Sequence, residues 1–172
     1  MGKIRVHARR DQTGIRDRVT ELVTVLEAMA EQIRETIRDV DGWEGTQVEA
    51  FWIPNPTPPS IDVYLADPGR EVAETGGFGA TDADALAGDW VNVRARVATN
   101  DAQANQRLLI ELCDPESDVA VVQALYDDPT LGGLVADLSL ETQSGFRPFP
   151  LLDGSAFHLG VLWTFLVIPA RS

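Results

Sequence analysis

Hydrophobic residues near the start of the chain repeat every three or four positions. From Ile15 to Val40 they form one continuous stripe, the spacing that places side chains on one face of an α-helix. Thr13 can cap the start of this helix, and Asp41-Gly42 is a typical end, because glycine tolerates the left-handed conformation that closes many helices. The pattern predicts a long N-terminal helix with a solvated opposite face.

Alternation of apolar and polar residues, with a period of two, predicts strands further along. It is clear in residues 60–66, 90–99 and 134–142. Because successive side chains of a strand point to opposite faces, each of these segments presents one apolar face to a core. In the third segment, the residues expected on the inner face are Leu134, Ala136, Leu138 and Leu140.

Two further segments are predicted as strands from their residue types. Residues 46–53 end at Pro54, the first of four prolines in what we expect to be a rigid extended linker, since proline cannot donate to a sheet. Residues 157–168 are apolar on both faces, which is typical of a strand in the middle of a covered sheet. A turn-rich loop, residues 143–155, is expected just before it.

Two short helices are expected between the middle strands. Asp101 can cap one that runs to Leu112, and Ser117 can cap another that is broken at Pro129. The order of elements predicts an α+β fold with a long N-terminal helix and a mixed β-sheet of about four to five strands. At 172 residues the chain fits a single domain, residues 1–172.

Two segments differ from the rest in composition. Residues 1–12 hold four Lys and Arg residues against one Asp, and form a basic arm in an acidic protein. Residues 67–89 hold five glycines and six acidic residues against Arg70. Loops of this length are uncommon unless they are functional or disordered, so the presence of this Gly-rich acidic loop calls for a reason.

The charge balance restricts the partners that the protein can have. With 14 basic and 27 acidic residues, the net charge is −13, a field that repels nucleic acid and anionic membranes. The first residues contain no apolar run, so neither a signal peptide nor an anchor is expected. Cys113 is the only cysteine, which is typical of a protein made in a reducing cytoplasm.

No arrangement of residues predicts catalysis, a cofactor or a metal ion. His7 and His158 are the only histidines and lie far apart, and Cys113 is expected to be a buried filler on an apolar helix end. The aromatic residues could stack on single-stranded nucleic acid, but Trp163 and Phe165 lie in the most apolar strand, which favours core packing.

Paired carboxylates leave one enzymatic alternative open. Asp82 with Asp84, or Asp127 with Asp128, could serve a small carboxylate-dependent hydrolase. With 27 acidic residues in the chain, however, such pairs arise often without a catalytic role. Replacing the carboxylates with amides would abolish any such activity.

Three stretches of the sequence resemble one protein family in their joint order and length. They are residues 15–37 (IRDRVTELVTVLEAMAEQIRETI), 90–114 (WVNVRARVATNDAQANQRLLIELCD) and 117–140 (SDVAVVQALYDDPTLGGLVADLSL), followed by a loop and a closing hydrophobic strand. This order is similar to that of the tail terminator proteins of long-tailed, siphovirus-like bacteriophages, especially those of actinobacteria. The resemblance covers most of the chain and is weakest in the Gly-rich acidic loop, residues 67–89, which looks like a variable insertion.

The resemblance implies a structural virion protein rather than an enzyme. Such a protein is assembled in the host cytoplasm and forms a homo-hexameric ring at the head-tail junction. The ring caps the tail-tube protein, stops tube growth and joins the head-completion (stopper) protein, while DNA passes through the lumen without specific binding. A head-side connector or a tail-tube subunit of related build is the alternative.

A head-to-tail ring needs two different contact surfaces on each subunit, and loops and polar strand faces can supply them. Arg94 and Arg96, on the polar face of their strand, are expected either to be solvated or to pair with acids of a neighbouring subunit. Acidic residues that line the lumen would repel DNA; alternatively, the charge mainly keeps the unassembled subunit soluble. The candidate interface residues are Arg70, Phe78, Asp82, Asp84, Arg94, Arg96, Phe146, Arg147 and Phe149.

Overall fold

The computed structural model describes residues 12–66 and 88–170, which form three helices and six strands. The predicted α+β class is confirmed, with two helices between the middle strands and six strands in place of four to five. The basic arm and nearly all of the Gly-rich acidic loop lie outside the described residues. The elements are α1 (Gln12–Ile37), β1 (Gln47–Ala50), β2 (Ser60–Leu65), β3 (Asp89–Val97), α2 (Ala102–Cys113), α3 (Val121–Tyr126), β4 (Val135–Gln143), β5 (Arg147–Pro150) and β6 (Phe157–Pro169).

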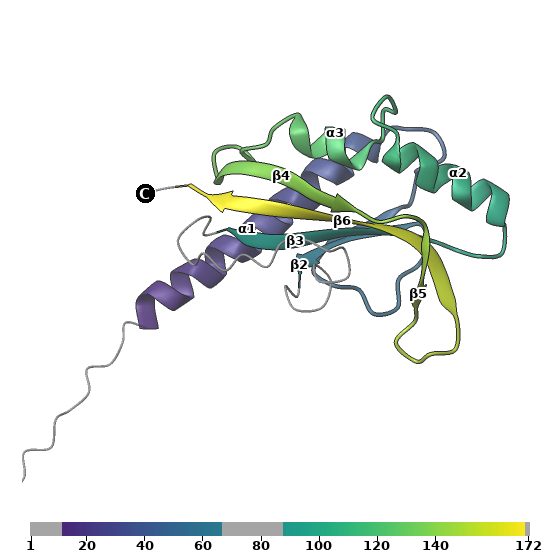
Figure 1. Cartoon of the computed structure of the whole chain (residues 1–172), viewed down its shortest axis with the longest axis horizontal. Helices are drawn as coiled ribbons and strands as arrows, with labels where there is room; N and C mark the ends of the chain where they lie inside the picture. The colour runs from purple at the N-terminus through teal and green to yellow at the C-terminus, as the bar shows by residue number, and fades with distance from the viewer. Residues whose placement is uncertain (1–11, 67–87, 171–172) are drawn as a thin grey trace, which may run out of the picture.

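The six strands form one mixed sheet in the order β1-β2-β3-β6-β4, with β5 also paired to β6. β1 and β2 are parallel, and all the other pairs are antiparallel. β6 pairs with β3, β4 and β5, so the segment predicted to lie in the middle of the sheet does so. The helices pack on one face of the sheet, which gives two layers (Figure 1).

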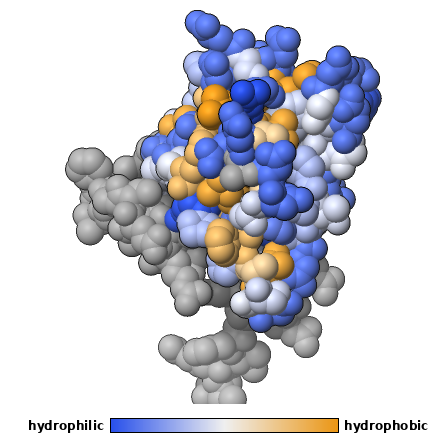
Figure 2. Space-filling model, turned by 90° about the vertical axis from the view of Figure 1, so that its right-hand side faces the viewer, coloured by the Kyte–Doolittle hydropathy of each residue, from blue (hydrophilic) through white to orange (hydrophobic). Residues whose placement is uncertain are grey.

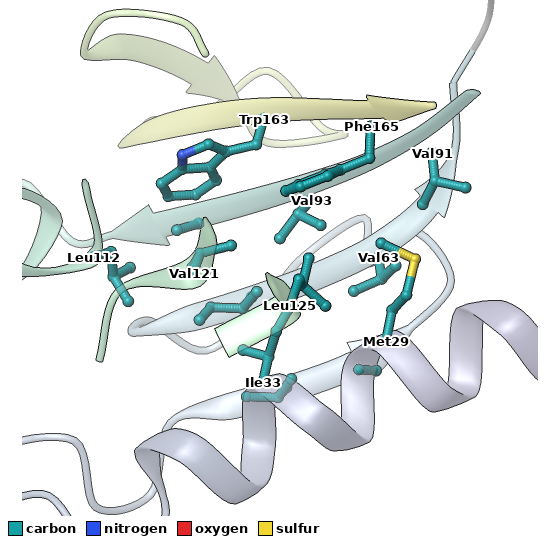
Figure 3. Close-up of a cluster of buried hydrophobic side chains, with 14 of the residues drawn as sticks. Met29, Ile33, Val63, Val91, Val93, Leu112, Val121, Leu125, Trp163 and Phe165 are labelled. Atoms are coloured by element: carbon teal, nitrogen blue, oxygen red, sulfur yellow. The ribbon is translucent and has the colours of Figure 1, made fainter. Parts of the chain in front are cut away.

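The hydrophobic core lies between the helices and the sheet (Figure 3). Met29 and Ile33 of α1 point toward the sheet, and Trp163 and Phe165 of β6 lie on the sheet face toward them; all four are fully buried. Burying a large apolar side chain contributes about 1.5–3 kcal/mol, so this layer of contacts holds the helices on the sheet. The predicted core role of Trp163 and Phe165 is confirmed.

The inward face of β4 differs from the prediction. Strict alternation placed Leu134 and Ala136 inside, but both are exposed, and Val135 is buried instead. The pairing of β4 with β6 shifts register between Val135 and Asp137, and one extra residue at such a bulge moves the following side chains to the other face. Leu138, beyond the bulge, is buried as predicted.

Of the two predicted helix caps after β3, one is confirmed. Asp101 accepts a hydrogen bond from the backbone N–H of Ala104 (3.1 Å) at the start of α2. Ser117 does not cap α3, because that helix begins later, at Val121, and has no side-chain cap. The Ser117 hydroxyl instead accepts a hydrogen bond from Val119 in the turn before the helix.

Three other boundaries differ from the sequence prediction. α1 begins before Thr13 and ends at Ile37, where the chain continues into turns. β1 is shorter than residues 46–53, because Phe51 adopts a left-handed backbone (φ 79°) that a strand does not allow. The predicted loop 143–155 contains β5, whose residues pair with the start of β6.

The connection between β1 and β2, residues 51–59, crosses the face of the sheet opposite the helices. Parallel neighbours require the chain to return along the sheet, and the helices occupy the other face. Ile53 in this connection is hydrogen-bonded to Asp62 and Arg96, which lie on that opposite face. The predicted proline-rich linker is therefore packed on the sheet, and its prolines reduce the number of backbone N–H groups that need partners there.

Gly160→Ala is expected to destabilise the fold by about 1–3 kcal/mol, the usual cost of overpacking. A Cβ at Gly160 of β6 would lie 2.3 Å from the carbonyl oxygen of Ala95 and 2.8 Å from the ring of Phe149. The free energy of unfolding, measured by urea denaturation, checks this. Gly145→Ala is the matched control, because its Cβ would meet no atom within 4 Å. Equal stability of the two variants would contradict the close packing at Gly160.

Candidate interaction site

Two arginines and one aspartate form a buried cluster on the face of the sheet opposite the helices. Arg94 and Arg96 project from β3, and Asp62 projects from the adjacent β2. Arg94 donates from Nε to Asp62 Oδ1 (3.1 Å) and from Nη2 to Oδ2 (2.5 Å), and Arg96 donates from Nη2 to Oδ2 (3.2 Å). Asp62 is 0% exposed, Arg96 2% and Arg94 7%. One carboxylate therefore orients both guanidinium groups.

The same cluster fastens the 51–59 connection to the sheet. The backbone N–H of Ile53 donates to Asp62 Oδ2 (3.0 Å), and Arg96 Nη2 donates to the carbonyl of Ile53 (2.8 Å). Because buried charges are tolerated only when they are paired and hydrogen-bonded, these bonds help to make the burial possible.

Aromatic rings surround the guanidinium of Arg94. Its central carbon lies 5.0 Å from the ring centre of Tyr64, 5.4 Å from that of Phe149 and 5.9 Å from that of Trp52. These distances suit cation–π attraction, which contributes about 0.5–2 kcal/mol per contact. Trp52 is 47% exposed, so one of the three aromatic rings around Arg94 reaches the surface of the protein.

The cluster holds two positive charges and one negative charge in a protein of net charge −13. Burial lowers the pKa of Arg96 to about 10, because desolvation disfavours its charged form more than the nearby Asp62 carboxylate favours it. Arg96 remains charged at neutral pH. Partial burial also lowers the pKa of His158, and the positive charge of Arg96 adds to this shift.

Arg94 and Arg96 differ from both sequence expectations, since neither is solvated and both pair with Asp62 of the same chain. The physical reason is that the 51–59 connection and Phe149 cover this face of the sheet. Phe149, predicted as an interface residue, is itself buried. Arg147 stacks on its ring at 4.9 Å, and Phe146 is exposed as an interface residue would be.

Arg70, Phe78, Asp82 and Asp84 lie outside the described residues, as does His7. Sequence reasoning missed Asp62 as the partner of the arginines. Its only signal was a charged residue on the polar side of an alternating strand, and the register that places it beside Arg94 is not readable from sequence.

Exposed hydrophobic side chains gather at both edges of the sheet and on one hairpin. The β1-edge surface is formed by Phe51, directly after β1, and the β4-edge surface by Tyr126 and Leu134, beside β4. Trp52 lies instead over Arg94, on the sheet face opposite the helices. Figure 2 looks at the end of the molecule that carries α2 and the β5–β6 hairpin, where hydrophobic residues form a band on a mostly hydrophilic face. The exposed hydrophobic residues of this hairpin surface are Phe146, Leu152 and Phe157.

The paired carboxylates that the structure describes have roles in a turn. Asp128 accepts hydrogen bonds from the side chain and backbone of Thr130 and from the N–H of Gly132, and these bonds lower its pKa. Asp127 accepts one from Gln123 (2.8 Å). Both therefore help to end α3, as its Asp-Asp-Pro sequence predicts.

Within residues 12–66 and 88–170, no group of three or more His, Cys, Asp or Glu side chains is placed to hold a metal ion. Cys113 is half-buried against the core, not fully buried as expected, and burial raises the pKa of its thiol to about 11. None of the described helices combines the length and the apolar content that crossing a membrane would require.

A scan against protein-family models and a search of curated proteins gave no match to this chain.

Asp62→Ala is expected to destabilise the protein by about 3–5 kcal/mol, because it leaves two buried guanidinium groups without their counter-charge. Urea denaturation followed by tryptophan fluorescence measures the change. Asp39→Ala removes an exposed carboxylate and serves as the control, with an expected change within about 0.5 kcal/mol. A similar small change at both positions would mean that Asp62 does not organise the cluster.

Proposed function

We propose that this protein is a ring-forming structural subunit of the tail terminator kind, which caps a phage tail tube where it meets the head. The proposal comes from the resemblance of residues 15–37, 90–114 and 117–140 to that family. It makes the protein a virion component whose partners are further copies of itself, the tail-tube protein and the head-completion protein.

The observation that supports this proposal best is the presence of separate hydrophobic surfaces at opposite edges of the sheet. A closed head-to-tail ring repeats one contact between two different patches of each subunit. The β1-edge surface and the β4-edge surface lie at the two ends of the strand order and differ in composition. Each is small, so partners of complementary shape, rather than a single large apolar patch, would have to complete the contact.

The hairpin surface gives the subunit a third contact region, suited to a partner above or below the ring. It is built on β5 and the start of β6, which is anchored in the middle of the sheet. Such rigid support favours a surface that must hold the same shape in every copy.

Electron microscopy of the protein with preassembled tail-tube rings of the phage that encodes it tests the proposal. We expect six-fold caps at tube ends and an arrest of further tube growth. Subunits that ignore tube ends and bind a portal complex instead would replace the terminator with a head-side connector. Growth of this protein into tubes of its own would make it a tube subunit.

Leu134→Glu is expected to reduce cap formation by about tenfold or more, because it places a charge in the β4-edge surface where a neighbour would bury it. Negative-stain counts of capped tube ends measure the loss, and a thermal melt checks that the fold is unchanged. Ile110→Glu is the matched control, since Ile110 of α2 is 52% exposed against 45% for Leu134 and lies in none of the three surfaces. Equal loss in both variants would argue against a specific edge contact.

A further inference from the structure

The open edge of β1 borders a groove that no described segment fills. The groove lies between α1 and β1, has a volume of about 560 Å³ and is open to solvent along its length. Three small side chains, Ala28, Ala30 and Ala50, line it. Three carboxylates line it as well, Glu27, Glu31 and Glu49, together with Arg34.

The backbone of β1 can accept another strand at this groove. The backbone N–H groups of Gln47 and Phe51 point toward β2 and donate to the carbonyl oxygens of Pro59 (3.1 Å) and Val63 (2.6 Å). Because such groups alternate along a strand, Val48 and Ala50 direct their N–H and C=O groups away from β2. The carbonyl of Val48 accepts a hydrogen bond from Arg34 (2.7 Å), so an added strand would have to displace this side chain from the edge.

The opposite edge of the sheet is protected against strand addition. β4 has two shifts in its pairing with β6, between Val135 and Asp137 and between Leu140 and Thr142. Bulges of this kind twist an edge strand and interrupt its row of backbone groups. The pairing of β1 with β2 continues without a shift over all four residues, so the structure has one edge that favours addition and one that does not.

The basic arm has a sequence suited to this groove. In residues 3–9 (KIRVHAR), Ile4, Val6 and Ala8 alternate with basic or histidine side chains, the period-two pattern of a strand with one apolar face. The apolar side chains match the alanines in the groove. Of its three carboxylates, Glu31 already pairs with Arg34 and Arg38, so Glu27 and Glu49 are the ones that the basic side chains of the arm would match.

The arm of a second copy fits this groove better than the arm of the same chain. The N-terminal half of α1 extends beyond the sheet, so the first residue of this helix, Gln12, lies away from the groove (Figure 1). To reach its own groove, the arm would have to reverse and run back about 18 Å, from Gln12 to Thr24 at ~1.5 Å per residue. Residues 3–11 contain neither glycine nor proline, the residues that favour such a reversal.

We propose that residues 3–9 of one copy bind in the groove of a second copy and add a strand to the open edge of β1. This strand exchange would supply a specific contact between subunits of the proposed ring. It rests on copies of the chain meeting side by side, as in that ring, but it does not require that they cap a tail tube. Strand addition of this kind gains affinity from main-chain hydrogen bonds and specificity from alternate side chains.

Disulfide trapping between two differently tagged chains tests the exchange. Both carry Cys113→Ala; one adds Arg5→Cys and the other adds Glu49→Cys. The chains are mixed under mild oxidation, alone and with tail-tube rings. We expect the yield of the mixed-tag covalent dimer to be at least about tenfold that of a control pair. In the control pair, Glu116→Cys replaces Glu49→Cys, because Glu116 is exposed and lies away from the groove.

A third chain, with Arg5→Cys and Glu49→Cys together, identifies the donor of the strand. Covalent dimers and larger species support exchange between copies. A closed monomer formed at high dilution would overturn it in favour of a chain that covers its own groove. A yield no higher than the Glu116→Cys control, with and without tube rings, would overturn strand binding in the groove altogether.

Reversing charges provides an independent prediction. Arg5→Glu or Glu49→Lys alone is expected to weaken self-association by about two- to fivefold, the size of an exposed ion pair. The two together should restore it, and Glu116→Lys should leave it unchanged. Sedimentation equilibrium measures the association. Single variants that associate as the wild type does, or a double variant that is weaker than either, would contradict the proposed pairing.

The outcomes separate strand exchange from the function proposed above. Trapped dimers without caps on tube ends would support the exchange and reject the terminator. Caps formed without trapping would support the terminator and reject the exchange.

Discussion

The Asp62 carboxylate is the interaction on which one whole face of this structure depends. It accepts hydrogen bonds from Arg94, Arg96 and the backbone of Ile53, so it joins β2, β3 and the 51–59 connection at a single point. Without it, the guanidinium groups would repel each other below a layer of aromatic rings, and the connection would lose its attachment. The helices on the other face are held differently, by apolar contacts that involve many residues and depend on none of them alone.

Periodicity in the sequence predicted the elements well where one face is simply apolar. The stripe of α1 and the doubly apolar β6 follow directly from side-chain spacing, because burial on a helix face or a sheet face imposes that spacing. β4 was predicted as a strand, but Leu134 and Ala136 were wrongly expected inside, because a bulge changes the face without leaving a sign in the residue types. The left-handed backbone at Phe51 shortened β1, and the residue types gave no sign of this either.

The interaction site was predicted less well, for a reason that is also physical. Charged residues on the polar side of a strand ordinarily reach water, and Arg94 and Arg96 would do so if nothing covered that side. Their burial depends on three partners remote in the chain: Asp62, Ile53 and Phe149. Only the packing of the connection and of β5 brings these together. Phe146 was expected at an interface and is exposed, whereas Leu134 was expected on the inner face and is exposed instead.

The central position of β6 has a consequence for how this protein forms. Because β6 pairs with β3, β4 and β5, three of the five strand pairings wait for the last of the strands to be synthesised. Of these, the pairing of β3 with β6 joins segments far apart in the chain, such as Val97 and Leu159, and closes slowly, since the intervening loop loses entropy first. On the ribosome, the nascent chain would expose unpaired edges of β3 and β4 until β6 has been synthesised. During this period nascent chains are most prone to associate incorrectly with one another.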